Sequence, residues 1–246
     1  MKYTKRSYRE KFRQEDLYHF QVVVKQTDLD IGIRRDRFSP EIVKFAQEIV
    51  LKKRELLEKY IEEDHAFLHS LTPHSLKPGA PQIAIDMAQA ARRAGVGPMA
   101  AVAGAFAHYV GSSLARRSRD VIVENGGDIY MRSARPRRIG VFAGHSPLSN
   151  RLALLIRPED TPLGICTSSG TVGHSLSLGE ADAVVILAPS AMLADAVATA
   201  AGNLIQTKDD VQKAAEFATR INGVRGALVI KDDRLAVCGK LKIVPS

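Results

Sequence analysis

Asp195 and Thr199 are the two side chains whose types and spacing point most directly to chemistry. They stand in "APSAMLADAVATAAGN", where Ser190 after Pro189 is placed to cap a helix over Ala191–Ala201. Residues four apart lie one turn above each other on the same helix face. A carboxylate and a hydroxyl offer hard oxygen ligands, which suit Mg²⁺ better than zinc. Two interpretations stay open on spacing alone: a magnesium site, or the solvent-facing side of an alanine-rich helix.

A pair of glycines in "VENGGDIYMRS" raises a second question, because it interrupts two runs that otherwise predict β-strands. Adjacent glycines supply no side chains to pack and lose the most backbone freedom on ordering. One interpretation is a hairpin turn, since Asn-Gly before residues that favour strands is a strong hairpin pattern. The other is a close approach of Gly126 and Gly127 to a ligand, with Asn125 and Asp128 as polar groups on either side.

Hydroxyls and glycines also gather in "CTSSGTVGHSLSLGEAD" after a predicted strand. Backbone amides freed by the glycines could cradle an anion together with Ser168, Ser169 and Thr171. The GxxxxGK[ST] order of a Walker loop is absent. A hydrolase that uses Ser169 and His174 is conceivable, but the Gly-x-Ser-x-Gly elbow is missing. A flexible surface loop is the simpler interpretation.

Composition narrows the class of protein. The chain has 246 residues, ample for a proper core, and only two cysteines, which favours a reducing, cytoplasmic setting without a disulfide framework. No apolar stretch reaches the ~20 residues of a membrane span. The net charge of +8 comes largely from the first fourteen residues and from "RSARPRR". Such patches attract phosphates, but no aromatic platform or DNA-binding motif accompanies them, so nucleic acid is a distant third hypothesis.

The elements that must position these residues follow from periodicity. Strands are predicted across 18–33 with a turn near Asp28, followed by a long amphipathic helix that opens at Ser39-Pro40. Further helices are predicted at 82–94, 98–116, 191–202 and 208–221. Strands are predicted at 120–123, 128–132, 139–142, 152–156, 164–167 and 183–187, with a closing hairpin of 227–231 and 235–243. Elements in blocks rather than strict βαβ alternation predict an α+β fold with largely antiparallel sheets packed with helices.

The predicted helix "PMAAVAGAFAHYVGSSLARR" carries small residues along one face, including Gly104 and Gly111. Such a face allows close approach by another backbone or by a flat ligand, and packing is the favoured explanation. His108 on the same face is interpreted as a core or edge histidine.

Three of these segments occur together in a specific order. "VENGGDIY", then "TSSGTVGH", then "ADAVVILAPSAMLADAVATAAGN" resembles the ApbE superfamily of FAD:protein FMN transferases. Through "KQTDLDI" and "AGVGPMAAVAGAFAHYVG" the chain is most similar to a short cytosolic branch of that superfamily. The resemblance covers about Tyr18 to the C-terminus and implies a single ApbE-like domain over 1–246, with 1–16 as a basic N-terminal segment.

The resemblance also implies roles for individual residues. Asp195 and Thr199 would bind Mg²⁺, with Asp195 and His174 as the catalytic candidates. The cofactor-binding candidates, which would line a cleft for FAD or FMN, are Asn125, Gly126, Gly127, Asp128, Thr167, Ser168, Ser169 and Gly170.

The chain departs from the transferase pattern in two places. The His-rich segment that leads into Asp-Pro-x-Thr-Gly is missing, with His174 as a remnant, and the Lys-Gly-x-Ala-x-Asp start of the central helix is replaced by "GVGPMAAVAG". Two functions are therefore carried forward. The first is a Mg²⁺-dependent enzyme that processes FAD, with a flavin nucleotide and an acceptor protein as partners. The second is a non-catalytic flavin or nucleotide-binding protein that supports a redox partner. The oligomeric state stays open, a homo-oligomer included.

Overall fold

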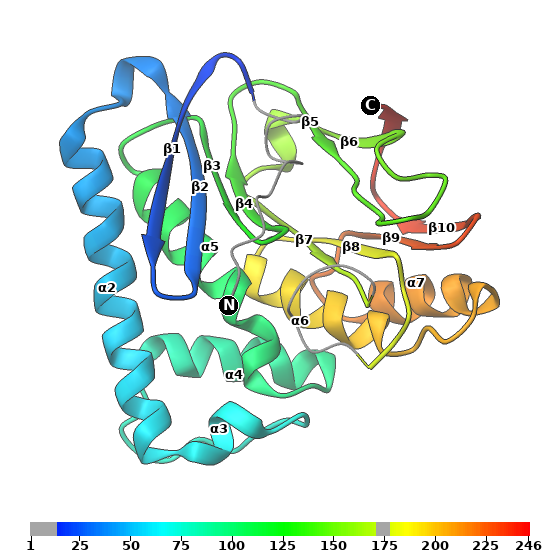
Figure 1. Ribbon diagram of the computed structural model, residues 1–246, viewed down its shortest axis with the longest axis horizontal. Coiled ribbons are helices and arrows are strands. Elements are labelled where there is room, and N and C mark those ends of the chain that lie inside the picture. Colours follow the sequence, from blue (N-terminus) through cyan, green and yellow to red (C-terminus); the bar gives the residue numbers. More distant parts are fainter. Residues whose placement is uncertain (1–13, 171–177) are drawn as a thin grey trace.

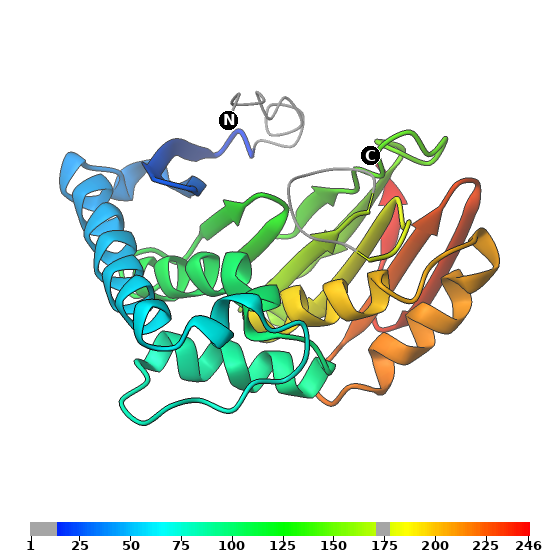
Figure 2. The same cartoon turned by 60° about the horizontal axis from the view of Figure 1, so that its bottom comes forward.

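The protein is organised around one large antiparallel sheet with helices on one face and a small sheet on the other. The computed structural model describes residues 14–170 and 178–246. Figure 1 shows the strands fanned across the molecule, and Figure 2 shows the helices side by side beneath them. This arrangement confirms the predicted α+β class with largely antiparallel sheets.

In the described part of the chain the large sheet has eight strands in the order β1-β2-β3-β4-β7-β8-β9-β10, all antiparallel to their neighbours. Their bounds are β1 Leu17–Val24, β2 Thr27–Arg34, β3 Val121–Asn125, β4 Asp128–Arg132, β7 Leu163–Ser168, β8 Ala183–Ala188, β9 Gly226–Lys231 and β10 Arg234–Gly239. The small sheet has the order β11-β6-β5, with bounds β5 Arg137–Gly140, β6 Leu152–Ile156 and β11 Ile243–Pro245.

The helices are α2 Pro40–Glu63, α3 His65–His69, α4 Gln82–Ala94, α5 Val102–Leu114, α6 Ala191–Gly202 and α7 Val211–Arg220. Four 3₁₀ turns complete the described elements: η1 Arg35–Arg37, η2 Pro98–Ala101, η3 Pro158–Asp160 and η4 Lys208–Asp210. Helix α4 is capped at its C-terminus by Gly95, which adopts a left-handed φ of 77°. A glycine takes this conformation without the steric cost of a Cβ. None of the described helices combines the length and apolar character needed to cross a bilayer.

Two hydrophobic layers follow from the alternation of side chains along the strands. Val123, Tyr130 and Cys166 face the helices and join a core with α2, α4, α5, α6 and α7. Their strand neighbours Ile122 and Ile165 face the other way and pack against the small sheet.

A buried arginine ties the start of β1 to the rest of the fold. The Arg137 side chain is only 4% exposed, and its guanidinium donates to the carboxylates of Asp16 and Asp120 and to the Ser133 hydroxyl. Asp120 also accepts from the Ala134 amide at 2.9 Å. Arg137 therefore contributes to the fold and is not part of a free phosphate-binding patch. The sequence pattern "RSARPRR" predicts that it belongs to such a patch, but the arginine is buried.

Several boundaries differ from the sequence prediction. The β1–β2 turn lies at Lys25–Gln26, where Lys25 has a φ of 52°, because Asp28 is buried and pairs with Val23 in the ladder. The closing hairpin ends at Gly239, whose φ of 81° turns the chain away, so that Ile243 pairs with Leu154 in the small sheet. The helices predicted from residues 98 and 208 each begin with a 3₁₀ turn.

Candidate functional site

The two glycines of "VENGGDIY" form the turn of the β3–β4 hairpin. Asn125 pairs with Asp128 across a two-residue connection, and Gly126 and Gly127 have φ values of 69° and 108°. Positive φ at both central positions is what a type I′ turn requires. The Gly127 amide donates to the Glu124 carboxylate at 2.9 Å. The hairpin interpretation is confirmed, and the glycines have a local reason to be there.

The same turn lies against the end of β7. The Thr167 amide donates to the Gly127 carbonyl at 3.2 Å. A Cβ on Gly127 would lie 3.4 Å from the Thr167 carbonyl oxygen. The fold thus joins the Gly-Gly-Asp segment to the first residue of the Thr-Ser-Ser-Gly segment.

Asp195 approaches the hairpin from the helix layer and meets the first turn of α5. The Gly104 amide donates to Asp195 Oδ2 at 2.8 Å. This contact needs a glycine, since a Cβ at position 104 would lie 2.3 Å from the Ala191 carbonyl oxygen and 2.9 Å from Asp195 Cβ. From the other side, the Asn125 amide group donates to the Ala103 carbonyl at 3.1 Å. The hairpin and α6 therefore both bond to the start of α5, so the small face of this helix serves close packing.

Burial and a like charge act together on Asp195. Loss of hydration raises the pKa of its carboxyl well above the ordinary range, and the negative charge of Asp128 raises it further. The amides of Gly104 and Ala103 oppose this change and do not cancel it. Asp195 therefore lies close enough to Asp128 for the charge of one carboxyl group to disfavour ionisation of the other.

Cys166 belongs to this cluster, although sequence reasoning overlooked it. It pairs with Asp128 in the β4–β7 ladder, is fully buried, and lies with Sγ 3.2 Å from the Ala191 carbonyl oxygen. Burial raises the pKa of its thiol, and the charges of Asp128 and Asp195 add to the effect. The strand register, which pairs position 166 with position 128, was the information that sequence alone lacked.

Of the remaining predicted residues, Ser168 ends β7, and Ser169 and Gly170 follow it. Ser168 Oγ is 3.7 Å from where a Cβ on Gly202 would stand, at the C-terminal end of the helix. Gly170 donates its amide to the Ala181 carbonyl at 2.9 Å, and Ser169 Oγ contacts the same oxygen at 3.4 Å. The Gly170 amide is thus occupied by the chain itself. His174 lies outside the described residues.

His108 is half-buried on the sheet-facing side of α5. Its ring meets Tyr130 edge-on, with ring centroids 5.3 Å apart, and burial lowers its pKa. Gly111, one turn further, lies against the same tyrosine, because a Cβ there would be 2.1 Å from the ring. These contacts agree with a core or edge histidine.

The chemistry of the donor set can be tested against magnesium. Asp195 Oδ2 is held by α5, which leaves Oδ1, and Thr199 stands one turn away on α6 as a half-buried residue. Both are hard oxygen donors, and a divalent cation would relieve the repulsion between Asp128 and Asp195. Among residues 14–170 and 178–246, no group of three or more His, Cys, Asp or Glu side chains could hold a metal. The residues fit Mg²⁺ only as a site that keeps positions for water and phosphate oxygens.

Comparison with known proteins gives consistent matches over most of the chain. A family model described as AbpE bacteria matches residues 9–232. A UPF0280 protein of Methanopyrus kandleri is 42% identical over 232 residues, covering 91% of this chain and 91% of the relative. A UPF0280 protein of Methanococcus vannielii is 37% identical over 231 residues, covering 92% of each chain.

Solved structures support the same grouping at the level of the fold. The apo flavinyl transferase ApbE of Pseudomonas stutzeri matches with a TM-score of 0.58 at 16% identity, covering 90% of this chain and 94% of the other. The flavin transferase ApbE of Vibrio cholerae matches with a TM-score of 0.55 at 15% identity, covering 90% and 96%. The fold is ApbE-like, and the chain belongs to the AbpE bacteria family together with the UPF0280 proteins.

Proposed function

We propose that the protein is a Mg²⁺-dependent enzyme that acts on FAD at the cluster around the first turn of α5. In the proposed reaction an oxygen of a protein hydroxyl or of water bonds to the phosphorus of the FMN half. The pyrophosphate bond to that phosphorus breaks, AMP leaves with the bonding electrons, and the proton of the attacking oxygen passes to solvent. The names of the structural neighbours, flavinyl and flavin transferases, suggest this substrate class.

One observation carries the proposal: two segments far apart in the sequence bond to one helix start, and a third bonds to the first of these segments. Asn125 bonds to Ala103, Asp195 bonds to Gly104, and Thr167 bonds to Gly127. The convergence places the β3–β4 hairpin, the end of β7 and the start of α6 around two carboxylates. A stable fold does not need a carboxyl group whose pKa is raised by burial and by a neighbouring carboxylate, because burying a charge is unfavourable.

The chain's own residues would bind and orient the substrate. Gly126 and Gly127 have no side chains, so a flavin nucleotide can approach the backbone of the turn closely. Asp195 is held in one orientation by Gly104, and it would hold Mg²⁺ together with Thr199. Bound there, the cation would neutralise charge on the pyrophosphate oxygens.

The test is to mix the purified protein with FAD and Mg²⁺ and to follow products by absorbance and mass spectrometry. Wild type should release FMN and AMP or gain a covalent flavin, and Asp195→Asn should do neither. Asp209→Asn is the matched control, because it removes the same charge from an exposed position and should keep full activity. Turnover that is equal in Asp195→Asn and wild type would contradict the assignment of Asp195.

A second candidate, a flavin-binding protein without turnover, is favoured by one specific observation. The Gly170 amide and Asp195 Oδ2 are both engaged within the chain. Both groups are therefore less available to a reacting phosphate than an open anion-binding loop would be. The same experiment separates the two: a stable yellow complex with intact FAD in wild type and in Asp209→Asn would select the binding protein.

A further inference from the structure

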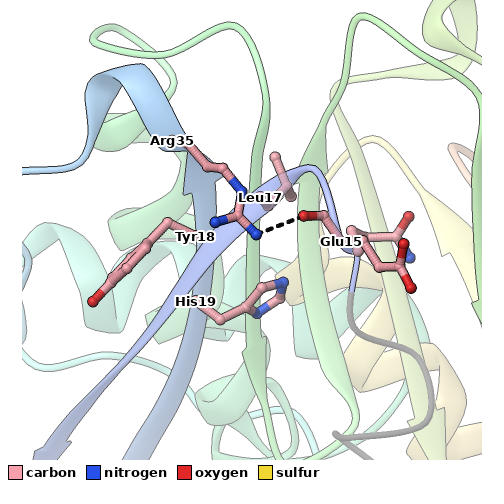
Figure 3. A pocket seen from close by; sticks show the side chains of 6 residues that line it. Glu15, Leu17, Tyr18, His19 and Arg35 are labelled. Carbon is pink, nitrogen blue, oxygen red and sulfur yellow. Dashed lines mark hydrogen bonds between the residues drawn. The ribbon is translucent and has the colours of Figure 1, made fainter.

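A surface pocket of about 390 Å³ lies on the sheet at the start of β1, and Figure 3 shows its lining. Leu17, Tyr18 and His19 from β1 line it together with Arg35 from the turn after β2. His19 is on the face opposite the helices, because it alternates with Phe20, which packs into the helix-side core. The pocket is therefore separate from the candidate flavin site.

The His19 ring is held in place by its strand partner and by a carboxylate. His19 pairs with Gly32, and a Cβ at Gly32 would lie 3.0 Å from Cε1 and 3.1 Å from Nε2 of the ring. Only the missing side chain lets the imidazole lie so close to β2. On its other side, Nδ1 lies 2.9 Å from Asp30 Oδ2, so the N–H at Nδ1 is donated to that carboxylate. This bond fixes which nitrogen is left over.

The leftover nitrogen, Nε2, is buried and has no hydrogen-bond partner. The His19 side chain is only 9% exposed, so water does not reach the ring freely. A buried polar atom without a partner costs free energy, and most such atoms in native proteins are satisfied by protein, water or a bound group. The pocket is the space beside this ring in which such a group can sit.

Arg35 supplies a cation at the same pocket. Its Nη2 donates to the Glu15 carbonyl at 2.8 Å, which orients the guanidinium at the pocket that His19 also lines (Figure 3). Within the described residues Arg35 makes no ion pair, whereas its neighbour Arg34 is paired with Asp36 at 2.8 and 2.9 Å. A guanidinium keeps several N–H donors in a planar fork that suits oxyanions. One N–H group of Arg35 thus positions the guanidinium, and its other N–H groups can donate to a ligand.

We propose that this pocket binds a small oxyanion, with inorganic phosphate as the model, between the Arg35 guanidinium and the His19 imidazole. With Nδ1–H given to Asp30, Nε2 is an acceptor, and the O–H of a hydrogen phosphate ion supplies the donor that it lacks while the other phosphate oxygens accept from Arg35. The Glu15 carboxylate at the rim limits the negative charge that the pocket accepts, which favours a single small anion over a polyphosphate chain.

The test is a phosphate titration of the full chain, followed through the ring ¹⁵N resonances of His19. The resonance is assigned by its loss in His19→Gln. Phosphate should shift it in a saturable manner, and sodium chloride at equal ionic strength should not. Arg35→Gln should weaken phosphate binding at least about tenfold, because it removes a charge-assisted contact. Arg34→Gln, which alters the paired neighbour, should leave the affinity unchanged.

Three results would overturn the proposal. The first is no shift of the His19 resonance up to saturating phosphate. The second is an equal shift with sodium chloride, which would reflect screening alone. The third is equal phosphate affinity in Arg35→Gln and wild type. Arg35 is exposed, so loss of binding in this variant with unchanged circular dichroism cannot be attributed to unfolding.

Discussion

Two pairs of carboxylates in this molecule have opposite surroundings. At the start of β1, Asp16 and Asp120 share the guanidinium of Arg137. At the start of α5, the charge of Asp128 acts on Asp195, and the groups that the described residues place beside Asp195 to oppose this effect are backbone amides. Burial alone would raise the pKa of Asp120, but hydrogen bonds from Ala134, Ser133 and Arg137 outweigh it and hold the pKa low.

This difference distinguishes carboxylates that stabilise the fold from carboxylates that are suited to binding a ligand. A carboxylate that is paired with a fixed arginine stabilises the folded chain. Its charge is already neutralised by the arginine, so it does not attract a cationic ligand. A carboxylate whose pKa is raised by burial and by a like charge is unfavourable without a further cation, and perturbed groups of this kind gather at functional sites. By this criterion the Asp128–Asp195 pair supports the proposed site, and the Arg137 cluster belongs to the scaffold.

Removal of the scaffold cation should have the largest effect on stability. Arg137→Ala leaves Asp120 buried without its counterion, and we expect the free energy of unfolding to fall by about 3–5 kcal/mol. Urea denaturation would measure it. Arg138→Ala is the control, because Arg138 is exposed and should change the free energy by no more than about 0.5 kcal/mol. Equal losses in the two variants would show that the pairing contributes little.

Adding a side chain between α5 and α6 should have the next largest effect on the free energy of unfolding. Gly104→Ala places a Cβ 2.3 Å from the Ala191 carbonyl oxygen, so the helices must separate. Overpacking of this kind costs about 1–3 kcal/mol, and displacement of Asp195 should also weaken Mg²⁺ binding measured by calorimetry. Gly202→Ala on α6 is the matched control, since its Cβ would meet only contacts of 3.7 and 3.8 Å. Gly202→Ala should leave the free energy of unfolding unchanged or raise it slightly.

The two carboxylate groups should also give opposite dependences on pH. The pKa of Asp195 is raised on folding, so its contribution to stability is full below the unfolded value and is lost as pH rises through the folded value. Asp195→Asn should therefore be more stable than wild type at pH 8, by at least about 1 kcal/mol, and the gap should close towards pH 4. Mg²⁺ should stabilise wild type and not the variant. A gap that widens towards low pH would contradict this sign.

For Asp16 and Asp120 the folded pKa is lowered, the Asp16 value chiefly by the Arg137 hydrogen bond. Their contribution is present above the unfolded value and is lost as pH falls through the folded value. The difference in unfolding free energy between wild type and Arg137→Ala should shrink below about pH 4. Thermal melts of wild type, Asp195→Asn and Arg137→Ala from acidic pH up to pH 8 would measure the pH dependence of stability for both carboxylate pairs.

Local chemistry made the elements of the fold predictable from sequence. The helices at Gln82–Ala94 and Ala191–Gly202 and the strands at Asp128–Arg132 and Leu152–Ile156 have the predicted bounds. For α4 the apolar periodicity ends at Gly95, a residue whose left-handed conformation stops the helix. Gly126 and Gly127 likewise formed the predicted hairpin turn, because positive φ at two successive positions is a local requirement.

Contacts set by register and by packing were not predictable. Nothing in the sequence places Asn125 opposite Ala103, or Cys166 beside Asp128, because both depend on how strands align and how α5 lies on the sheet. Arg137 counted as surface charge in the sequence and proved to be buried among carboxylates. The family resemblance supplied the order of the site segments, but it gave no hint that Gly104 holds Asp195.

The smallest expected effect is a labelling difference between two cysteines, and it probes the charge at the site directly. Cys166 lies beside Asp128 and Asp195, and burial together with these charges raises the pKa of its thiol, whereas Cys238 is only half-buried on β10. Iodoacetamide at pH 7.5 should therefore modify Cys238 and leave Cys166 unmodified by mass spectrometry, since the thiolate is the reacting form. A neighbouring cation would have the opposite influence on the thiol. Rapid labelling of Cys166 in the folded protein would mean that the site is open and positively charged, and the contrast between the two carboxylate groups would then fail.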